Sequence, residues 1–218
     1  MTHYSTVIFD LDGTLLETLE DLHLTLNHTL ETLGMPVRTL EETRSFVGNG
    51  IRRLIERAVP AGTGEDAIAE ANAEFDRHYA AHCNDHTHPY PGVLELLARL
   101  RERGVRLAVV SNKTQYAVDE LVGIHFAGAF DAVVGVREGV ARKPARDMVD
   151  VALVEMGGAE AGAAVYVGDS EVDVATAAAA ELPCLSVSWG FRTPAQLREA
   201  GATTICATAE ELEAALLA

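Results

Sequence analysis

The feature that most constrains the fold is a regular alternation of short apolar runs with amphipathic helical patterns. The apolar runs are rich in β-branched residues, and they occupy 6–9, 106–110, 132–136, 163–167 and 184–187. Helical patterns between the later runs cover 93–103, 115–122, 146–156 and 172–180. Nearly uninterrupted apolar strands that alternate with helices indicate a parallel sheet covered on both faces. We therefore predict an α/β fold with a Rossmann-like parallel sheet.

Residues 16–88 interrupt this alternation. They contain three or four helical patterns, the clearest at 16–33, 50–58 and 65–83, and no convincing strand. Gly34 and Pro36 are expected to end the first helix, because glycine adopts the left-handed cap and proline cannot continue a helix. We predict a catalytic core formed by 1–15 and 89–218, with an inserted all-helical cap domain at 16–88.

The composition is that of a globular protein with an acidic surface. The 218 residues are 48% hydrophobic, and the net charge is −16. Such a charge repels nucleic acids and anionic membranes, and an anionic substrate would need local cations or a metal. The cysteines are odd in number and widely spaced, which is typical of a reducing compartment. We expect a cytoplasmic monomer or homodimer with no nucleic-acid partner and no membrane association.

Two carboxylates, Asp10 and Asp12, directly follow the first predicted strand. In a parallel sheet this is the edge where ligands bind. Residues two apart on an extended segment point the same way, so both side chains can face one site, and Gly13 allows a sharp turn behind them. The alternative interpretation is an ordinary Asp-Gly turn at a strand end.

Polar residues follow the next three predicted strands as well. Ser111-Asn112-Lys113 is expected at a helix N-terminus, where free N–H groups suit an oxyanion, and Lys143 follows the third strand. Asp169 and Asp173 follow the fourth, four positions apart. Each alone is typical of a cap or a solvated side chain. Together they place several carboxylates in one crevice, which implies a hard cation such as Mg²⁺.

These segments resemble a known set of motifs. The ordered set DxDGT at 10–14, Ser111-Asn112-Lys113, Lys143-Pro144 and GDSxxD at 168–173 resembles the four motifs of the haloacid dehalogenase (HAD) superfamily. The helical insert resembles the small helical, C1-type cap of that superfamily. Within it, residues 46–51, 90–93 and 189–191 are most similar to phosphoglycolate phosphatases.

The resemblance implies a Mg²⁺-dependent phosphomonoester hydrolase that converts a small phosphorylated substrate, 2-phosphoglycolate above all, to glycolate and phosphate. Asp10 would be the nucleophile that becomes an aspartyl phosphate. Asp12 would protonate the leaving oxygen and then activate water. Lys143 would offset the charge of Asp10 and of the phosphate.

The resemblance also implies the binding residues. Thr14, Ser111 and Asn112 would bind the phosphoryl group. The Mg²⁺ ligands would be Asp10, the Asp12 carbonyl and Asp169, with Asp173 as a further acid.

A substrate-reading segment is expected in the cap. Gly48 and Gly50 permit close backbone approach, and Arg52 and Arg53 suit a substrate carboxylate. Asn49, between the two glycines, is expected to belong to the same substrate-binding segment. The alternative is that both arginines are solvated helix residues. A dinucleotide site is excluded because the glycine pattern lacks its third glycine and follows no strand.

The sequence departs from the family pattern at three places: Glu17-Thr18, Arg146 in place of a second proline, and Glu181-Leu182 before Pro183. Arg146, with Arg142, adds positive charge beside Lys143. Relatives often have glycine before Pro183, so either a residue here is left-handed, at a cost of about 1 kcal/mol, or the turn differs.

A cluster of His82, Cys83, His86 and His88 superficially suggests a transition-metal site. Its spacing matches no common zinc pattern, and it lies where the cap rejoins the core. We predict a polar hinge, which stoichiometric zinc in the untagged protein would contradict.

Other functions remain open. They are a HAD phosphatase for another small phosphoester, a phosphomutase similar to β-phosphoglucomutase, and a non-catalytic binding module on the same scaffold. The presence of both Asp10 and Asp12 argues against the last. Dehalogenation is disfavoured because that chemistry uses no Mg²⁺.

Overall fold

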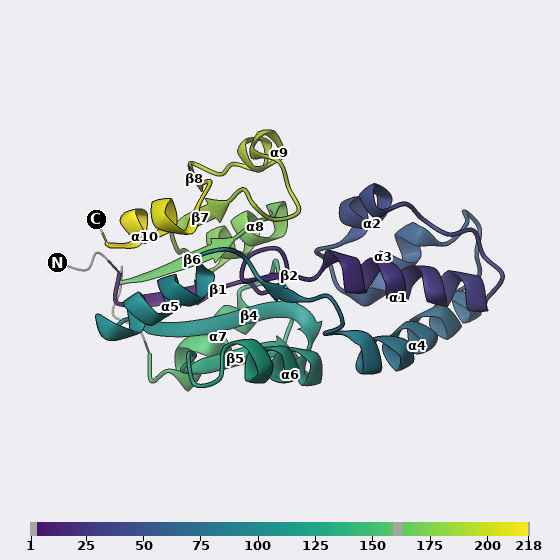
Figure 1. Ribbon diagram of the computed structural model, residues 1–218, viewed down its shortest axis with the longest axis horizontal. Coiled ribbons are helices and arrows are strands. Elements are labelled where there is room, and N and C mark those ends of the chain that lie inside the picture. The colour runs from purple at the N-terminus through teal and green to yellow at the C-terminus, as the bar shows by residue number, and fades with distance from the viewer. Residues whose placement is uncertain (1–3, 159–162, 218) are drawn as a thin grey trace. The chain divides into compact units, whose positions relative to one another are not determined.

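The computed structural model describes residues 4–158 and 163–217, and the chain divides into two compact units (Figure 1). The sheet unit comprises Met1–Leu16 and Pro89–Ala218, and the helical unit comprises Glu17–His88. The strands of the sheet are β1 (Thr6–Phe9), β4 (Arg106–Thr114), β5 (Ala132–Val136), β6 (Ala164–Gly168), β7 (Cys184–Val187) and β8 (Thr204–Cys206). The helices of the sheet unit are α5 (Val93–Glu102), α6 (Gln115–His125), α7 (Asp147–Glu155), α8 (Glu171–Ala179), α9 (Pro194–Glu199) and α10 (Ala209–Leu217).

The sheet is parallel, with strand order β5-β4-β1-β6-β7-β8. β1 is central, and Thr6 pairs with Arg106 on one side and with Ala164 on the other. The strand order reverses direction at β1, which in open α/β sheets creates a crevice at the carboxyl ends of the strands. The residues after β1 therefore enter that crevice.

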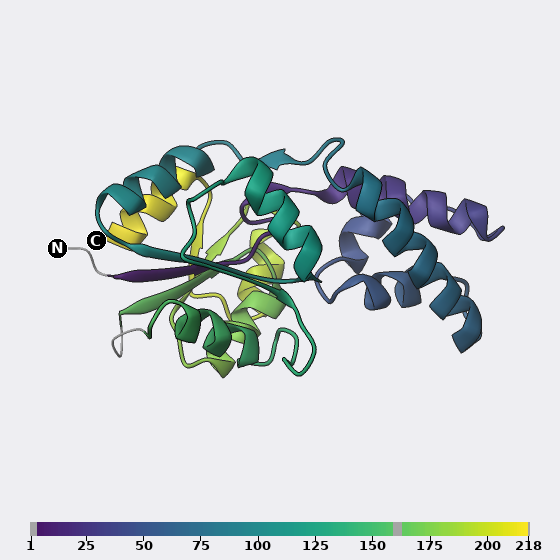
Figure 2. The same cartoon turned by 90° about the horizontal axis from the view of Figure 1, so that it is seen from below.

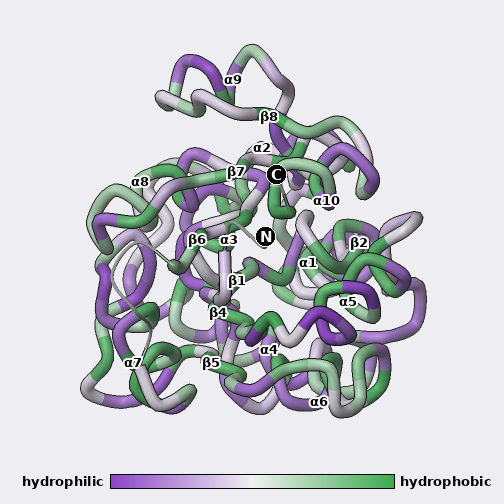
Figure 3. The backbone as a smooth tube through the Cα atoms, turned by 90° about the vertical axis from the view of Figure 1, so that its left-hand side faces the viewer, coloured by the Kyte–Doolittle hydropathy of each residue, from purple (hydrophilic) through white to green (hydrophobic). Residues whose placement is uncertain are grey.

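Helices cover both faces of the sheet, as the uninterrupted apolar strands require. Figure 2 shows α5, α6 and α10 on one face and α7 and α8 on the other. Ile8 and Tyr166 point toward the second face, where they join a buried cluster with Met148 and Val149 of α7. Figure 3 shows hydrophilic and hydrophobic stretches within one helix such as α5, whose apolar face is buried.

The helical unit contains α1 (Leu19–Thr32), α2 (Leu40–Phe46), α3 (Ile51–Ala58) and α4 (Glu65–His82). Leu22, Leu26 and Leu30 recur every four residues and form the buried stripe of α1. Phe75 and Tyr79 of α4 are buried with the same spacing and stack on each other. Gly34 has φ +66 just beyond α1, which confirms the predicted helix end.

The chain crosses between the units through two short strands. β2 (Leu16–Glu17) pairs with β3 (His88–Pro89), so the prediction of no strand in this region is wrong at both of its ends. The buried carboxylate of Asp21 accepts hydrogen bonds from the backbone N–H groups of His86 and Thr87 and from the Thr87 hydroxyl. This carboxylate ties the segment that leads into β3 to α1.

Other boundaries differ from expectation in instructive ways. β4 continues to Thr114, so Ser111-Asn112-Lys113 lies in the end of a strand and not at a helix N-terminus. The first helix begins at Leu19 because Leu16 and Glu17 are extended. Glu181 has φ +59, so the left-handed alternative predicted before Pro183 is the one adopted. Within the described residues, no helix combines the length and hydropathy needed to cross a bilayer.

Candidate active site

Three carboxylates converge at the carboxyl edge of the sheet. Asp10 directly follows β1, Asp169 directly follows β6, and Asp173 lies in the first turn of α8. One oxygen from each lies within 4.8 Å of the others, and all three residues are buried. β1 and β6 run side by side, and the Asp10 N–H donates to the Val167 carbonyl at 2.9 Å. The pairing of two distant segments thus brings together acids that are far apart in sequence.

A single buried ammonium links two of these acids. Lys143 Nζ lies 2.8 Å from Asp10 Oδ1, 2.9 Å from Asp173 Oδ1 and 3.0 Å from the Tyr166 hydroxyl. Burial alone would lower the pKa of Lys143, but the facing carboxylates of Asp10 and Asp173 raise it well above its ordinary value. Lys143 therefore stays charged and holds Asp10 and Asp173 in place.

The two oxygens of Asp173 serve different partners. Oδ2 accepts from the Ser170 N–H at 3.1 Å and from the Ser170 hydroxyl at 2.6 Å, which completes a capping box at the start of α8. Oδ1 accepts from Lys143 and from Tyr166. Asp173 therefore anchors Lys143, and Tyr166 is a member of the site that the sequence analysis missed. Its only sequence signal is a polar tip in an otherwise apolar strand.

Asp169 is held by the backbone of a distant segment. Its Oδ2 accepts the Phe191 N–H at 2.6 Å, and the Thr14 hydroxyl lies 3.4 Å from its Oδ1. A Cβ on Gly13 or on Gly190 would overlap with the Asp169 carboxylate, so only glycine allows these two segments to approach it. Gly13 also has φ +83.

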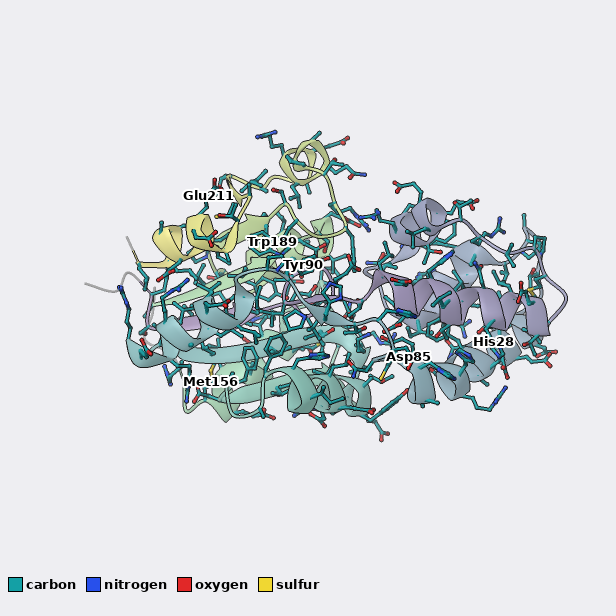
Figure 4. All side chains as sticks on the ribbon, in the orientation of Figure 1. His28, Asp85, Tyr90, Met156, Trp189 and Glu211 are labelled. Atoms are coloured by element: carbon teal, nitrogen blue, oxygen red, sulfur yellow. The ribbon has the colours of Figure 1, made fainter. Side chains whose placement is uncertain are left out.

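The segment around Gly190 is fastened to the loop after β1. The Trp189 indole N–H donates to the Thr14 carbonyl at 3.0 Å, and Tyr90 lies beside Trp189 with ring centroids 6.4 Å apart (Figure 4). These contacts fix the loop that carries Asp10 and Asp12. In the sequence, residues 189–191 carry a resemblance to the family but no sign of this role.

The end of β4 supplies a second buried ammonium. Lys113 Nζ forms an ion pair with Asp12 Oδ1 at 3.1 Å, and the Lys113 side chain is only 3% exposed. The Ser111 hydroxyl accepts the Lys113 N–H at 3.2 Å, and the Asn112 amide donates to the Lys143 carbonyl at 3.1 Å. The expected cluster is therefore brought together, with Lys113 as an additional member.

The raised pKa values of two of the acids indicate that the site lacks positive charge. Burial, followed by the charge of Asp173, raises the pKa of Asp10 to about 7, although Lys143 opposes the shift. Burial and the charges of Asp173 and Asp10 raise the pKa of Asp169 well above its ordinary value. Carboxylates so close together favour a hard divalent cation, which prefers oxygen ligands. The residues present therefore fit a metal ion of this kind.

Comparison with known proteins agrees with this geometry. Residues 7–187 match the family model described as haloacid dehalogenase-like hydrolase. The chain belongs to the haloacid dehalogenase-like hydrolase family. The phosphoglycolate phosphatase of Mesorhizobium japonicum (strain LMG 29417 / CECT 9101 / MAFF 303099) is 36% identical over 202 residues, which cover 88% of this chain and 86% of the relative.

Two further relatives extend the comparison. The phosphoglycolate phosphatase of Pseudomonas syringae pv. syringae (strain B728a) is 33% identical over 189 residues, covering 85% of this chain and 70% of the relative. A crystal structure from Lactobacillus delbrueckii subsp. bulgaricus ATCC BAA-365 superposes with a TM-score of 0.94 at 37% identity, covering 100% of this chain and 99% of that one. The predicted membership of the HAD superfamily and the α/β fold are thereby confirmed.

The other predicted substrate-binding residues lie in the helical unit. The ion pairs of the two arginines and the hydrogen bond of Asn49 are made with other residues of that unit. Arg52 contacts Glu56 and Glu65, and Arg53 contacts Glu56. The Asn49 side-chain oxygen accepts from Arg57 at 2.6 Å. Gly48 and Gly50 both have positive φ, and Gly50 is the N-cap of α3. Both candidate arginines are thus neutralised within their own unit.

The residues of the histidine and cysteine cluster have separate partners. His82 Nδ1 lies 2.7 Å from Asp85 Oδ2, and His88 Nδ1 lies 2.8 Å from the His86 carbonyl. His86 faces Glu20 at 3.8 Å, while Cys83 is buried. Within the described residues, the one group of acids, histidines and cysteines close enough to hold a metal is Asp10, Asp169 and Asp173.

Proposed function

We propose that this chain is a Mg²⁺-dependent phosphatase that hydrolyses 2-phosphoglycolate through an aspartyl phosphate on Asp10. The observation that carries the proposal is the buried cluster of Asp10, Lys143 and Asp173 beside the Asp12–Lys113 ion pair. Such a cluster supplies a carboxylate nucleophile, a second carboxylate for proton transfer and fixed positive charge. Membership of a hydrolase family supports the hydrolytic direction of the reaction.

In the first step, an Asp10 oxygen attacks the phosphorus of the ester. The bond from phosphorus to the leaving oxygen breaks, and its electron pair stays on that oxygen, which takes a proton from Asp12. Lys143 offsets the charge on Asp10 and, with Asp173, fixes its orientation. Thr14, Ser111 and Asn112 bind the phosphoryl oxygens.

In the second step, Asp12 accepts a proton from water as the water oxygen attacks the phosphorus. The bond between phosphorus and Asp10 breaks, which returns the Asp10 carboxylate and releases inorganic phosphate. Asp10, Asp169 and the Asp12 carbonyl would hold Mg²⁺, whose positive charge would offset that of the acids and of the phosphoryl group. Asp173 accepts a hydrogen bond from Lys143 and so holds the Lys143 ammonium beside Asp10.

The choice of 2-phosphoglycolate is supported by the relatives. Both curated relatives described above are named phosphoglycolate phosphatase, and the alignments cover 85% and 88% of this chain. A fold alone does not define a substrate, so this support comes from the names of similar proteins and is open to direct test.

The test is phosphate release with Mg²⁺ from 2-phosphoglycolate, sugar phosphates, nucleotides and pyrophosphate. The expected result is the highest kcat/KM with 2-phosphoglycolate and a loss of at least about 10³-fold in Asp10→Asn. Circular dichroism of the variant controls for folding. A folded Asp10→Asn with wild-type activity would overturn the mechanism, and a preference for another ester would overturn the substrate. Formation of an isomeric sugar phosphate without net release would instead identify a phosphomutase.

A further inference from the structure

Three cations are buried among the described residues of the sheet unit, and each of them contacts a carboxylate. Lys143 directs its ammonium to three acceptors, on Asp10, Asp173 and Tyr166. An ammonium has three N–H donors, so these contacts use all of them. Arg192 forms a two-pronged contact with Glu171, at 2.8 and 3.2 Å. Lys113 is the third buried cation.

Lys113 and Lys143 contact different acids of the site. Lys143 contacts Asp10, the attacking group of the proposed reaction, whereas Lys113 Nζ lies 3.1 Å from Oδ1 of Asp12. Asp12 delivers its proton to the leaving oxygen, so a cation beside Asp12 lies next to the organic part of the substrate. A buried ammonium is costly, and Lys113 is held there by a strand end whose backbone is tied to Ser111.

On this basis we propose that Lys113 binds the carboxylate of the substrate and thereby selects a phosphorylated small acid. The inference rests on the proposed function and deepens it. In 2-phosphoglycolate a single carbon separates the ester oxygen from the carboxylate. A side chain that contacts Asp12, which protonates the ester oxygen, is therefore close enough to contact the carboxylate as well. When substrate binds, its carboxylate either replaces Asp12 as the partner of Lys113 or joins it. The buried ammonium of Lys113 is therefore paired in both states.

The residue proposed to bind the substrate carboxylate therefore lies in the sheet unit and not in the helical unit. Arg52 and Arg53 were the candidates from the sequence, but each contacts a glutamate of its own unit, and their side chains are 45% and 67% exposed. Charged contacts that are open to water are weak, whereas the attraction between a buried ammonium and a carboxylate is stronger because the interior screens charge less than water does. Lys113 has the burial that strong discrimination requires.

The experiment compares 2-phosphoglycolate with ethyl phosphate, in which a methyl group replaces the carboxylate. We expect Lys113→Met to lower kcat/KM for 2-phosphoglycolate by roughly 100-fold and to cause a much smaller loss for ethyl phosphate. Arg101→Met is the matched control, because it removes one positive charge from an exposed ion pair with Asp131. Thermal melting of each variant reports on folding. Lys113→Gln keeps a hydrogen-bond donor and offers the same comparison if the methionine variant does not fold.

The outcomes separate this inference from the proposed function. An equal loss with both esters would overturn it, since Lys113 would then act only by positioning Asp12. An unchanged kcat/KM for 2-phosphoglycolate would overturn it as well. If the wild-type enzyme hydrolyses other esters but shows no preference for 2-phosphoglycolate over ethyl phosphate, 2-phosphoglycolate is not its substrate. That result overturns the proposed function whatever the Lys113 variant does. A selective loss in Lys113→Met supports both.

Discussion

The ion pairs at the candidate active site of the sheet unit and the ion pairs of the helical unit place charge in opposite environments. In the sheet unit, Asp10, Lys143 and Asp173 are buried and come from segments far apart in the chain. In the helical unit, several ion pairs join residues three or four positions apart on one helix, namely Arg44–Glu41, Arg52–Glu56, Arg53–Glu56 and Arg77–Glu74. Buried charges cost desolvation energy, whereas exposed pairs contribute little to stability. The difference indicates that chemistry, rather than stability, explains the buried charges of the sheet unit.

Loss of the central ammonium should have the largest effect. Lys143→Met leaves Asp10 and Asp173 facing each other without a cation, so we expect a loss of about 3 to 5 kcal/mol in the free energy of unfolding. Urea denaturation at pH 8 without Mg²⁺ measures this loss. A change of less than about 1 kcal/mol would contradict the view that Lys143 compensates the buried acids.

Metal binding should stabilise the sheet unit in a pH-dependent way. The pKa of Asp10 is raised from 3.8 to about 7, so the folded chain binds a proton that the unfolded chain releases. Without metal, stability therefore falls as the pH rises from about 4 through 7. A cation binds the deprotonated acids, so Mg²⁺ should raise the melting temperature more at pH 8 than at pH 5.5.

At a concentration of 100 Kd the stabilisation by Mg²⁺ at pH 8 is about 2.7 kcal/mol. Calorimetry with Mg²⁺ and with EDTA at both pH values tests this. Equal shifts at pH 8 and pH 5.5 would argue against ligation by Asp10 and its neighbours.

A single methyl group should disturb the site next most strongly. In Gly190→Ala the new Cβ would overlap with the Gly13 carbonyl and the Asp169 carboxylate, so backbone must shift. We expect a loss of about 1 to 3 kcal/mol together with reduced phosphate release. Gly123→Ala, in α6 with nothing within 4 Å of the new atom, is the control and should stabilise the helix by about 1 kcal/mol. Equal effects of the two substitutions would remove the argument for close packing at Gly190.

A smaller effect of pH is expected in the helical unit. His78 stacks between His28 and His82, with ring centroids 3.9 and 4.3 Å apart. Burial, then the charges of His28 and His82, lowers the pKa of His78 below 6.5, against opposition from Glu74. The unfolded chain then binds more protons, so stability should fall as the pH drops below about 6.5.

Melting curves at pH 7.5 and 5.5 test this, and His78→Gln should show the smaller difference between them. His88→Gln, at an exposed histidine outside the stack, is the control. An unchanged difference in His78→Gln would place the pH dependence elsewhere.

The smallest effect should come from an exposed arginine of the helical unit. Arg53 pairs with Glu56 on the surface of α3 and is 67% exposed. Arg53→Met should leave the melting temperature and kcat/KM for 2-phosphoglycolate unchanged within error. A loss of activity with 2-phosphoglycolate but not with ethyl phosphate would return the substrate reader to the helical unit and weaken the case for Lys113.

Local pattern predicted much of the fold. β1, β5 and β7 have the predicted bounds because their apolar runs end at polar residues or turns. β8 and α9 were missed, since Thr204–Cys206 is short and mostly not buried, and six residues make a weak helical period. β4 was predicted too short because its last four residues are largely polar yet extended.

Prediction of the site had a similar limit. The motif residues after each strand were identifiable because strand ends and carboxylates are visible in sequence. Tyr166, Lys113 and Gly190 were missed as functional residues because their roles depend on partners in other segments. Contacts across 23 or 175 positions, such as Lys143 to Tyr166 or Trp189 to Thr14, leave no local pattern.

The pairing of β2 with β3 has a consequence for how the sheet assembles. The chain leaves the sheet unit after β1 through β2 and re-enters it before α5 through β3. Because β2 and β3 pair, the two ends of the stretch Glu17–His88 lie next to each other. An unstructured loop becomes costlier to close as it lengthens, by about 0.6 kcal/mol for each doubling. Once its helices have formed, the inserted stretch brings its two ends together and shortens the effective separation between β1 and β4. The rate at which the central strand finds its neighbour should therefore depend on the prior folding of helices that contribute no strand to that sheet.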